Sequence, residues 1–451
     1  MPKKLFLIFF SIIIIITSVF APISVSAYEV TEFDISAKAG ILVSLDTGKV
    51  LYENNTNEKL YPASITKIMT TILILENDKY KADEKISMTK SAMDLVLGTG
   101  SSVSTLKEGE TFSQLDLVHL VLMASAGDVT YLAAEYYGGS VENFVQMMNN
   151  KAKELGLKGT HYQNPVGLHD PENYTTVNDI RTLTEYALKN ETFKEICAKK
   201  RYTMPATNMS GERTLSTTNF LQDNTTNYYY QYAKGVKTGF TDEAGRCLVS
   251  TASYNGYNYL CILMGCPANK GRRYEFLESA SLYRWAFNNF SYKKVANSNE
   301  PVCEVPVKLS LETDFVPLYF KQPFVTVLPN EANDSTFVIK PNLKSETVEA
   351  PIKKGQVLGT ADIIYAEEVI GTVDLVANDN IEAFSILKIG DSILKFFKSK
   401  PVKYIGLALI IIIVLAILIY ILMCVYLNYG RIKKRKVRYM PYKKGEFDDK
   451  E

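Results

Sequence analysis

Residues 62–75 read Pro-Ala-Ser-Ile-Thr-Lys-Ile-Met-Thr-Thr-Ile-Leu-Ile-Leu and carry the clearest helix pattern in the first half of the chain. The apolar side chains recur at the spacing of one face of an α-helix, and Pro62 stands at the position where a helix prefers to begin. The sequence therefore predicts a helix with one buried face. Its apolar positions are Ile65, Ile68, Met69, Ile72 and Leu75.

Two apolar segments precede this helix. Residues 39–45 and 49–52 are separated by Asp46-Thr47-Gly48, a turn sequence that contains glycine. Short apolar runs on either side of such a turn predict a β-hairpin. Further periodic segments predict helices around residues 115–137, 141–155, 179–198 and 274–290, and strands around 247–252 and 257–265.

The pattern changes after about residue 300. Short alternating segments such as 305–309 and 347–350, with a turn cluster at 353–355, predict a small all-β domain over residues 300–378. Residues 379–404 then predict an amphipathic segment near a membrane surface, with a plain juxtamembrane linker as the alternative. Its apolar residues are Ile386, Leu387, Ile389, Ile393, Leu394, Phe396 and Phe397.

Residues 405–427 are uncharged and mostly aliphatic. At about 1.5 Å per residue they span roughly 34 Å, enough to cross a ~30 Å hydrocarbon core, and they predict a transmembrane helix. The tail that follows, residues 428–451, begins with a basic block, which favours the cytoplasmic side. The block comprises Arg431, Lys433, Lys434, Arg435, Lys436 and Arg438.

The first 27 residues have the features of a signal peptide. Lys3 and Lys4 precede an apolar run, and Val25-Ser26-Ala27 offers small residues for cleavage after Ala27. An uncleaved N-terminal anchor is the alternative. Either way, we expect the body of the protein to be exported and held in the cell membrane on the extracellular side.

Composition narrows the function classes. Lys and Arg total 50 against 49 Asp and Glu, so the body lacks the excess positive charge of a nucleic-acid-binding protein. The three histidines lack metal-ligand spacing, and no zinc site is expected. The six cysteines show no paired spacing; a disulfide framework is not expected, although a single bond such as Cys247 to Cys261 stays open.

Ser64 and Lys67 are one helical turn apart, so their side chains share a face near the helix start. A desolvated, neutral lysine could take the proton of the serine hydroxyl. Ser-x-x-Lys alone is weak evidence, because the chain also contains it at Ser87/Lys90, Ser104/Lys107, Ser291/Lys294, Ser385/Lys388 and Ser392/Lys395.

Two downstream elements distinguish Ser64. Lys237-Thr238-Gly239 is the only Lys-Thr-Gly in the chain and lies in a glycine-bordered segment, 235–245, where a strand can approach a ligand closely. Ser125 lies in Met-Ala-Ser-Ala-Gly-Asp, residues 123–128, after a helical segment.

With these three elements the chain resembles the penicillin-binding serine D-Ala-D-Ala carboxypeptidases of the peptidase S11 type, whose motifs are Ser-x-x-Lys, Ser-x-Asn and Lys-Thr-Gly. The resemblance covers roughly residues 28–293 and implies an α/β (α+β), β-lactamase/transpeptidase-like catalytic domain, with an antiparallel sheet flanked by helices. The β domain and the C-terminal anchor also fit. Further similar segments are residues 48–52, 61–64, 164–168, 174–176 and 237–245.

The resemblance also implies roles for single residues. Ser64 would be the nucleophile, Lys67 its base and Ser125 a proton relay, with oxyanion donors at the N–H groups of Ser64 and Phe240. Lys237, Thr238 and Gly239 would bind substrate, and Arg272 would support carboxylate recognition unless it is an ordinary surface arginine. The substrate would be a peptidoglycan stem peptide, β-lactams would acylate Ser64, and no cofactor is implied.

One residue departs from the family pattern. Gly127 stands where the second motif has asparagine. Loss of one positioned polar contact can cost about 10²-fold in rate. We therefore expect weakened activity, or a neighbouring side chain or water in place of the amide. The alternatives are a catalytically silent, wall-binding or β-lactam-sensing protein, and a β-lactamase.

Overall fold

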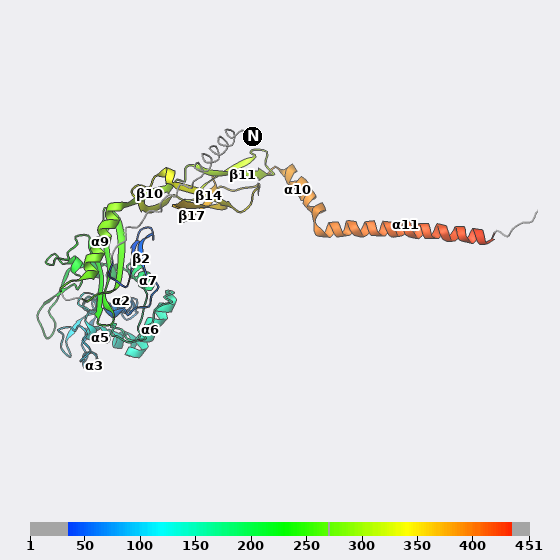
Figure 1. The fold of residues 1–451 in the computed structure, drawn as a ribbon. Coiled ribbons are helices and arrows are strands. Elements are labelled where there is room, and N and C mark those ends of the chain that lie inside the picture. The colour runs from blue at the N-terminus through cyan, green and yellow to red at the C-terminus, as the bar shows by residue number, and fades with distance from the viewer. Residues whose placement is uncertain (1–34, 269–270, 435–451) are drawn as a thin grey trace, which may run out of the picture. The chain divides into compact units, whose positions relative to one another are not determined.

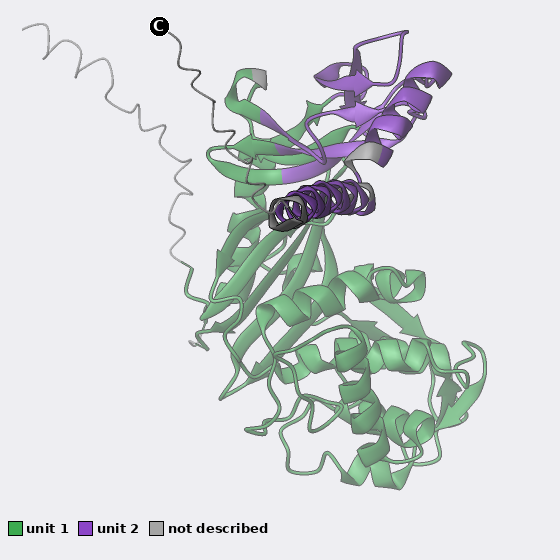
Figure 2. Cartoon of the chain, turned by 90° about the vertical axis from the view of Figure 1, so that its right-hand side faces the viewer, with its two compact units in different colours: residues 1–296, 323–338, 363–370 green, residues 297–322, 339–362, 371–451 purple. Residues whose placement is uncertain are grey.

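The computed structural model describes residues 35–268 and 271–434. Two compact units divide the chain: residues 1–296 with 323–338 and 363–370, and residues 297–322 with 339–362 and 371–451 (Figure 2).

A five-stranded antiparallel sheet forms the centre of the first unit, in the order β2-β1-β9-β8-β7 (Figure 1). The predicted hairpin is confirmed, because β1 pairs with β2 in antiparallel register. β7 is an edge strand, so one side of its backbone is not paired within the sheet. The strands are β1 Ala39–Ser44, β2 Val50–Asn54, β7 Ala233–Thr241, β8 Gly245–Tyr254 and β9 Tyr257–Cys266.

Helices cover both faces of this sheet. Successive residues of a strand point to opposite faces, and Ile41 and Leu42 of β1 accordingly enter two different cores. Ile41 packs in the core that contains residues of the helices between β2 and β7, whereas Leu42 packs in the core that contains Phe276 of the helix after β9. The helices are η1 Ala63–Thr66, α2 Lys67–Leu75, α3 Lys90–Asp94, α4 Gln114–Leu122, α5 Gly127–Gly138, α6 Val141–Glu154, α7 Val177–Ala187, α8 Glu191–Ala198, η2 Phe220–Gln222 and α9 Tyr274–Asn289.

α2 is more deeply buried than its sequence pattern predicts. Residues Lys67 to Ile74 are buried on every side, not along one face. The reason is that α2 lies in contact with α4, α5, α6, α7 and α8. Ser64 lies in the short 3₁₀ turn η1 that leads into it.

Two of the predicted helical stretches are each split in two. The stretch 115–137 breaks between α4 and α5, where Ser125 has a positive φ of 58°. The stretch 179–198 breaks at Asn190, whose side chain caps α8 by accepting the N–H of Phe193. Two short hairpins complete the unit: β3 Lys85–Ser87 with β4 Thr111–Ser113, and β5 Arg201–Met204 with β6 Arg213–Ser216.

A two-stranded antiparallel sheet, β10 Phe290–Ala296 with β13 Phe324–Pro329, follows α9. A six-stranded sheet follows in the order β14-β16-β17-β12-β11-β15. Its strands are β11 Pro301–Lys308, β12 Phe315–Phe320, β14 Phe337–Leu343, β15 Val348–Glu349, β16 Val357–Tyr365 and β17 Glu368–Ala377, and η3 spans Asp334–Thr336.

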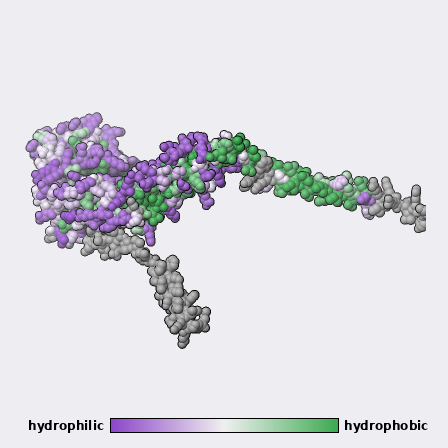
Figure 3. Space-filling view, turned by 90° about the horizontal axis from the view of Figure 1, so that it is seen from above, coloured by the Kyte–Doolittle hydropathy of each residue, from purple (hydrophilic) through white to green (hydrophobic). Residues whose placement is uncertain are grey.

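Two helices end the described chain. α10 Ser385–Lys398 contains the predicted amphipathic residues, and α11 Lys400–Lys434 contains the predicted transmembrane segment. Residues Tyr404–Tyr429 of α11 are long and apolar enough to cross a membrane, and Figure 3 shows their continuous hydrophobic surface. The predicted signal peptide, residues 1–27, and the end of the basic tail lie outside the described residues.

All six cysteines are free. Cys247 and Cys261, the pair left open by the sequence, are each buried as thiols, and burial raises the pKa of both to about 12. The open alternative of a disulfide between them is therefore not realised in this structure.

Candidate active site

Ser64 and Lys67 lie together at the junction of η1 and α2. Lys67 Nζ is 3.1 Å from Ser64 Oγ. The same nitrogen donates to the carbonyl oxygen of Val166 at 2.7 Å. Lys67 is fully buried, whereas Ser64 is partly exposed. The carbonyl oxygen of Val166 thus accepts one hydrogen of the Lys67 amine, and the hydroxyl of Ser64 is its second neighbour.

The environment of Lys67 favours the neutral amine. Burial lowers the pKa of Lys67 well below its ordinary value, and the positive charge of Lys237 lowers it further, while Asp128 acts in the opposite direction. A neutral amine has a lone pair that can accept the hydroxyl proton of Ser64.

Ser125 and Lys237 form a second serine–lysine pair. Lys237 Nζ donates to Ser125 Oγ at 3.0 Å, and both side chains are almost completely buried. Burial lowers the pKa of Lys237 to about 7, against a small opposing effect of Cys197. Ser125 and Ala63, the residue before the nucleophile, both have positive φ angles. Such strained positions in non-glycine residues concentrate at functional sites.

β7 passes very close to the nucleophile. A Cβ atom on Gly239 would lie 3.0 Å from the Pro62 carbonyl oxygen and 3.2 Å from the Ser64 backbone nitrogen. Glycine is therefore needed here so that the edge strand can lie against η1. Gly239 therefore lies close to the backbone of Ser64, and Phe240 is the next residue of the strand.

Family models identify the same two regions. Residues 25–268 match the model described as D-alanyl-D-alanine carboxypeptidase, and residues 290–383 match the C-terminal domain of penicillin-binding protein 5.

The chain belongs to the D-alanyl-D-alanine carboxypeptidase family.

Curated relatives support this membership. This family member is 31% identical over 355 residues to D-alanyl-D-alanine carboxypeptidase DacF of Bacillus subtilis, covering 78% of this chain and 87% of the relative. It is 32% identical over 392 residues to DacC of Escherichia coli, covering 80% and 89%. Penicillin-binding protein 5 from Haemophilus influenzae has a similar structure, with 27% identity, a TM-score of 0.63 and coverage of 78% and 99%.

The resemblance seen in the sequence is thus confirmed, and with it the fold class. The catalytic unit of this family member is a transpeptidase-like α/β domain, followed by an all-β domain and one apolar C-terminal helix.

Arg272, a predicted carboxylate-binding residue, is exposed, and its guanidinium lies over the ring of Tyr274 at 5.0 Å. No hydrogen bond joins it to the motif residues in the described part of the chain. Arg246 lies nearer to the third motif: it is opposite Phe240 in the β7–β8 register, and its guanidinium is 4.8 Å from the Phe240 ring. The structure therefore brings together every predicted site residue except Arg272.

The space beside Gly127 is already filled. A Cβ atom at this position would lie 2.2 Å from Ser101 Oγ and 3.2 Å from the Ser102 carbonyl oxygen. The N–H of Gly127 donates to that carbonyl at 2.7 Å. The serine hydroxyl thus occupies the volume into which the asparagine of the family motif would begin to project.

The loop that carries Ser101 is held at two points on the C-terminal side of this residue. Ser104 donates its N–H and its hydroxyl to the carboxylate of Asp128, at 2.9 and 2.6 Å. Asp128 follows Gly127 in α5, so the same carboxylate that anchors the segment also lies close enough to Lys67 to affect its pKa.

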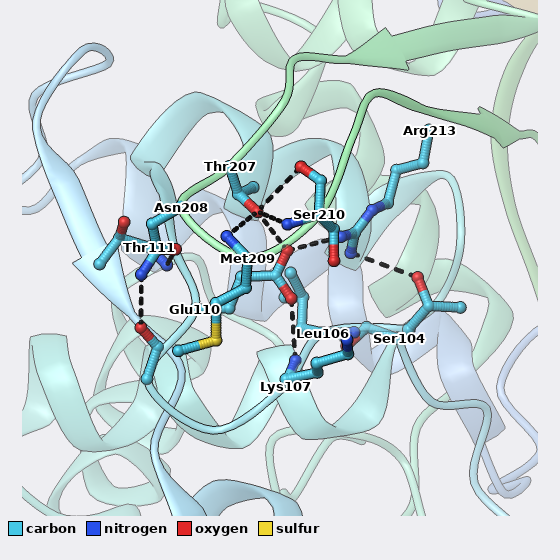
Figure 4. A network of polar contacts seen from close by, with 12 residues as sticks. Ser104, Leu106, Lys107, Glu110, Thr111, Thr207, Asn208, Met209, Ser210 and Arg213 are labelled. Carbon is cyan, nitrogen blue, oxygen red and sulfur yellow. Dashed lines mark hydrogen bonds and ion pairs between the residues drawn. The ribbon is translucent and has the colours of Figure 1, made fainter.

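Glu110 fixes the far end of this segment, as Figure 4 shows. Its fully buried carboxylate accepts the hydroxyl of Thr207 at 2.6 Å and the N–H of Lys107 at 2.9 Å, and it pairs with Arg213. Arg213 also donates to Thr105 Oγ1 at 3.3 Å. Ser101 therefore lies in a loop that is braced against α5 and against the β5–β6 connection.

Two groups at the site were not predicted from the sequence. The carbonyl of Val166 holds Lys67, and Thr218 Oγ1 lies 2.6 Å from Thr238 Oγ1. Val166 could have been found, because its segment 164–168 was one of those that resemble the family. Nothing around Thr218 distinguishes it from the many other threonines.

Proposed function

We propose that this protein is a membrane-anchored serine D-alanyl-D-alanine carboxypeptidase that removes the terminal D-Ala from peptidoglycan pentapeptide stems. Family membership supports the activity, and one observation carries the mechanism: a fully buried lysine amine lies 3.1 Å from the hydroxyl of Ser64.

Acylation begins with proton transfer from Ser64 to the neutral amine of Lys67. Ser64 Oγ then forms a bond to the carbonyl carbon of the penultimate D-Ala. The resulting oxyanion accepts hydrogen bonds from the backbone N–H groups of Ser64 and Phe240, and positioned donors of this kind account for several kcal/mol of transition-state stabilisation in acyl-transfer enzymes, about 3 kcal/mol each.

The C–N bond breaks when the leaving amine receives a proton. We assign the relay of this proton to Ser125, whose hydroxyl accepts a hydrogen bond from Lys237 Nζ at 3.0 Å. D-Ala departs and leaves an ester on Ser64. Water then attacks the ester, with Lys67 again acting as the base, and the shortened stem is released.

The terminal carboxylate of the substrate meets Lys237 and Thr238. Its negative charge would favour the protonated form of Lys237, whose pKa is otherwise lowered to about 7 by burial. Thr238 can donate its single hydroxyl hydrogen to the carboxylate while its oxygen accepts a hydrogen bond from the Thr218 hydroxyl. Gly239 keeps β7 close enough for these contacts.

The direct test is the release of D-Ala from a synthetic peptide that ends in D-Ala-D-Ala. Wild-type protein should release it, and Ser64→Ala should not. Release by the Ser64→Ala variant at the wild-type rate would refute the assignment of the nucleophile.

Gly127 favours a second candidate, a catalytically weak or silent penicillin-binding or wall-binding protein. A weak enzyme should form a penicillin adduct slowly, whereas a silent protein should form none. A β-lactamase, the third possibility, would form the adduct and lose it rapidly by hydrolysis. The time course of the intact mass after penicillin treatment therefore separates the three.

For the chain as a whole we propose a signal peptide over residues 1–27, the catalytic domain over 28–293, a β domain over 300–378, an amphipathic linker over 379–404, a membrane span over 405–427 and a cytoplasmic tail over 428–451. The apolar surface of Tyr404–Tyr429 supports the span. The basic residues after it favour the cytoplasmic side for the tail and the extracellular side for the body.

Protease added to intact cells tests this topology. It should digest the body and spare an epitope tag placed after residue 451. Loss of the tag together with protection of the body would reverse the proposed orientation.

A further inference from the structure

The segment just before β7 is unusually rich in tyrosine. Residues 228–232 read Tyr-Tyr-Tyr-Gln-Tyr, and the last four of them line a pocket of about 430 Å³. Tyr254, the last residue of β8, forms another part of the wall. Arg284, Phe287 and Asn288 complete it from α9, where their spacing puts them on one face of the helix. The volume is within the usual range of small-molecule sites.

This aromatic pocket is separate from the reaction centre. Tyr232 precedes Lys237 by five residues, about 17 Å along an extended strand. Tyr230 packs in the core on the α9 side of the sheet, whereas Ile65, next to the nucleophile, belongs to the core on the other side. A ligand in the aromatic pocket therefore leaves the hydroxyl of Ser64 free.

The rings of the pocket are held by one another and are still open to solvent. The centre of the Tyr254 ring lies 4.3 Å from that of Tyr232 and 5.7 Å from that of Phe287. Tyr254 is nevertheless 39% exposed, and Tyr229 is 45% exposed. Tyrosine rings offer a large, flat contact surface at a low cost in side-chain freedom. The pocket thus presents a preformed surface on which a flat ligand could pack.

The rim of the pocket carries polar groups that have no partner. The guanidinium of Arg284 lies over the ring of Tyr230, 5.5 Å from its centre. The side chains of Arg284, Gln231 and Asn288 form no hydrogen bond or ion pair within residues 35–268 and 271–434. A guanidinium donates hydrogen bonds, and a side-chain amide both donates and accepts them. These three groups are therefore available to a ligand with several hydroxyl or amide groups.

Tyr230 adds a buried polar group. Its side chain is only 7% exposed, and its hydroxyl forms no hydrogen bond in the part of the chain that the structure describes. Burial raises the pKa of Tyr230 to about 12, although Arg284 acts in the opposite direction, so the hydroxyl keeps its hydrogen at neutral pH. Buried polar groups are almost always hydrogen-bonded. A ligand in the pocket would supply the missing acceptor.

We propose that the aromatic pocket binds a sugar residue of an N-acetylated glycan strand. The C–H face of a sugar ring would pack on the tyrosine rings, whose faces carry partial negative charge. The hydroxyl and acetamido groups at the edge of the sugar would pair with Tyr230, Gln231, Arg284 and Asn288. Arg284 is the one cationic side chain among the described residues that line the pocket, which favours a neutral ligand over a polyanion.

The choice of this glycan rests on the proposed function, which brings the enzyme to peptidoglycan. The inference adds a second contact with the same polymer. The catalytic site handles the end of a stem peptide, and the aromatic pocket would hold the sugar backbone of the wall while stems are trimmed.

Titration with an oligosaccharide of N-acetylglucosamine tests the proposal. Full-length protein is used in a detergent without a sugar headgroup, and binding is followed by calorimetry. We expect a dissociation constant on the order of 1 mM. Ser64→Ala should bind equally well, and a sugar-free peptide that ends in D-Ala-D-Ala should not compete.

Two variants identify the groups responsible. Tyr230→Phe removes only the unpartnered hydroxyl, so it should bind the oligosaccharide about fivefold more weakly and keep the wild-type melting temperature. Tyr229→Ala removes an exposed ring and should bind about tenfold more weakly. Tyr80→Phe is the matched control, because it also removes a tyrosine hydroxyl without a partner but lies outside the pocket; its affinity should be unchanged.

The outcomes are separable from those of the proposed function. Both pocket variants should release D-Ala from a sugar-free peptide at the wild-type rate, and absence of release by the wild type would refute the function alone. Absence of oligosaccharide binding, or unchanged affinity in both pocket variants, would overturn the sugar site. Tighter binding of inorganic phosphate, lost in Arg284→Gln, would also overturn it in favour of an anion site.

Discussion

The side-chain nitrogen of Lys67 lies 3.1 Å from the hydroxyl oxygen of Ser64, in a position that excludes water from the amine completely. The sequence places these residues one turn apart, but the chemistry depends on what surrounds them. Burial and the second cation, Lys237, make the neutral amine the favoured form. Lys67 can therefore act as a general base and not as a permanent cation.

The stability of the protein should depend on pH through Lys67. Its pKa is depressed in the folded state, so folding expels a proton, and the folded state gains stability as the pH rises towards the ordinary lysine value of about 10.4. The free energy of unfolding of the wild type should therefore rise between pH 7 and 10 relative to that of Lys67→Met, by up to about 1.4 kcal/mol per pH unit, and its melting temperature should rise with it.

Thermal unfolding of both proteins across this pH range measures the difference. Lys189→Met, a change at an exposed lysine, serves as the control and should follow the wild type. Parallel curves for wild type and Lys67→Met would mean that Lys67 is protonated in the folded protein.

The rate constant of acylation should fall at high pH because Lys237 loses its proton. Above its pKa of about 7 this side chain loses its charge and with it the attraction for the substrate carboxylate. We expect the second-order rate constant for acylation by benzylpenicillin to decline above about pH 7. The Lys237→Arg variant should acylate more slowly. Because arginine keeps its charge, the decline of the rate constant should begin several pH units higher than in the wild type. If the rate constant of Lys237→Arg declined at the same pH as that of the wild type, the titrating group would be a residue other than Lys237.

Gly127→Asn should not accelerate acylation by itself. The new Cβ atom would meet Ser101 Oγ at 2.2 Å, and the loop is braced by Asp128 and Glu110. Overpacking of this kind costs about 1–3 kcal/mol. Removing the hydroxymethyl group should relieve it, so Gly127→Asn with Ser101→Gly should acylate about tenfold faster than Gly127→Asn alone.

These effects can be measured by stopped-flow acylation and by the melting temperatures of Gly127→Asn, Ser101→Gly and the double variant, which together form a double-mutant cycle. Faster acylation by Gly127→Asn alone would show that the loop yields and that glycine is the whole impairment.

Thr218 should support substrate binding through Thr238. Their hydroxyl oxygens are 2.6 Å apart, and Thr218→Val removes this hydrogen bond while keeping the side-chain shape. Loss of about 1 kcal/mol, the usual value of such a bond, predicts a roughly fivefold lower kcat/KM for D-Ala release. Thr225→Val, at an exposed threonine, is the control. Equal kcat/KM values for Thr218→Val and the control would exclude a role for this pair.

The sequence predicts the elements of the catalytic unit well where their patterns are local. The β1–β2 hairpin, α6, β8, β9 and α9 lie close to their predicted positions. It overestimates the continuity of helices at Ser125 and Asn190, because a positive φ and an N-cap interrupt patterns that remain apolar. It also predicts one buried face for α2, since a periodic pattern does not reveal how many neighbours will surround a helix.

The residues of the site also fall into those that the sequence predicts and those that it does not. Ser64, Lys67, Ser125 and Lys237 could be selected by spacing and by family resemblance, and the fold brings them together. The Val166 carbonyl and Ser101 could not be selected by side-chain chemistry, because one acts through its backbone and the other by filling a volume that glycine leaves free.

The intact mass of the protein after exposure to benzylpenicillin tests the central claim most directly, since it asks whether Ser64 is an activated nucleophile. Wild-type protein should gain the mass of one penicillin, and folded Ser64→Ala should gain none. An unmodified wild type, or an adduct of equal yield on Ser64→Ala, would contradict the account.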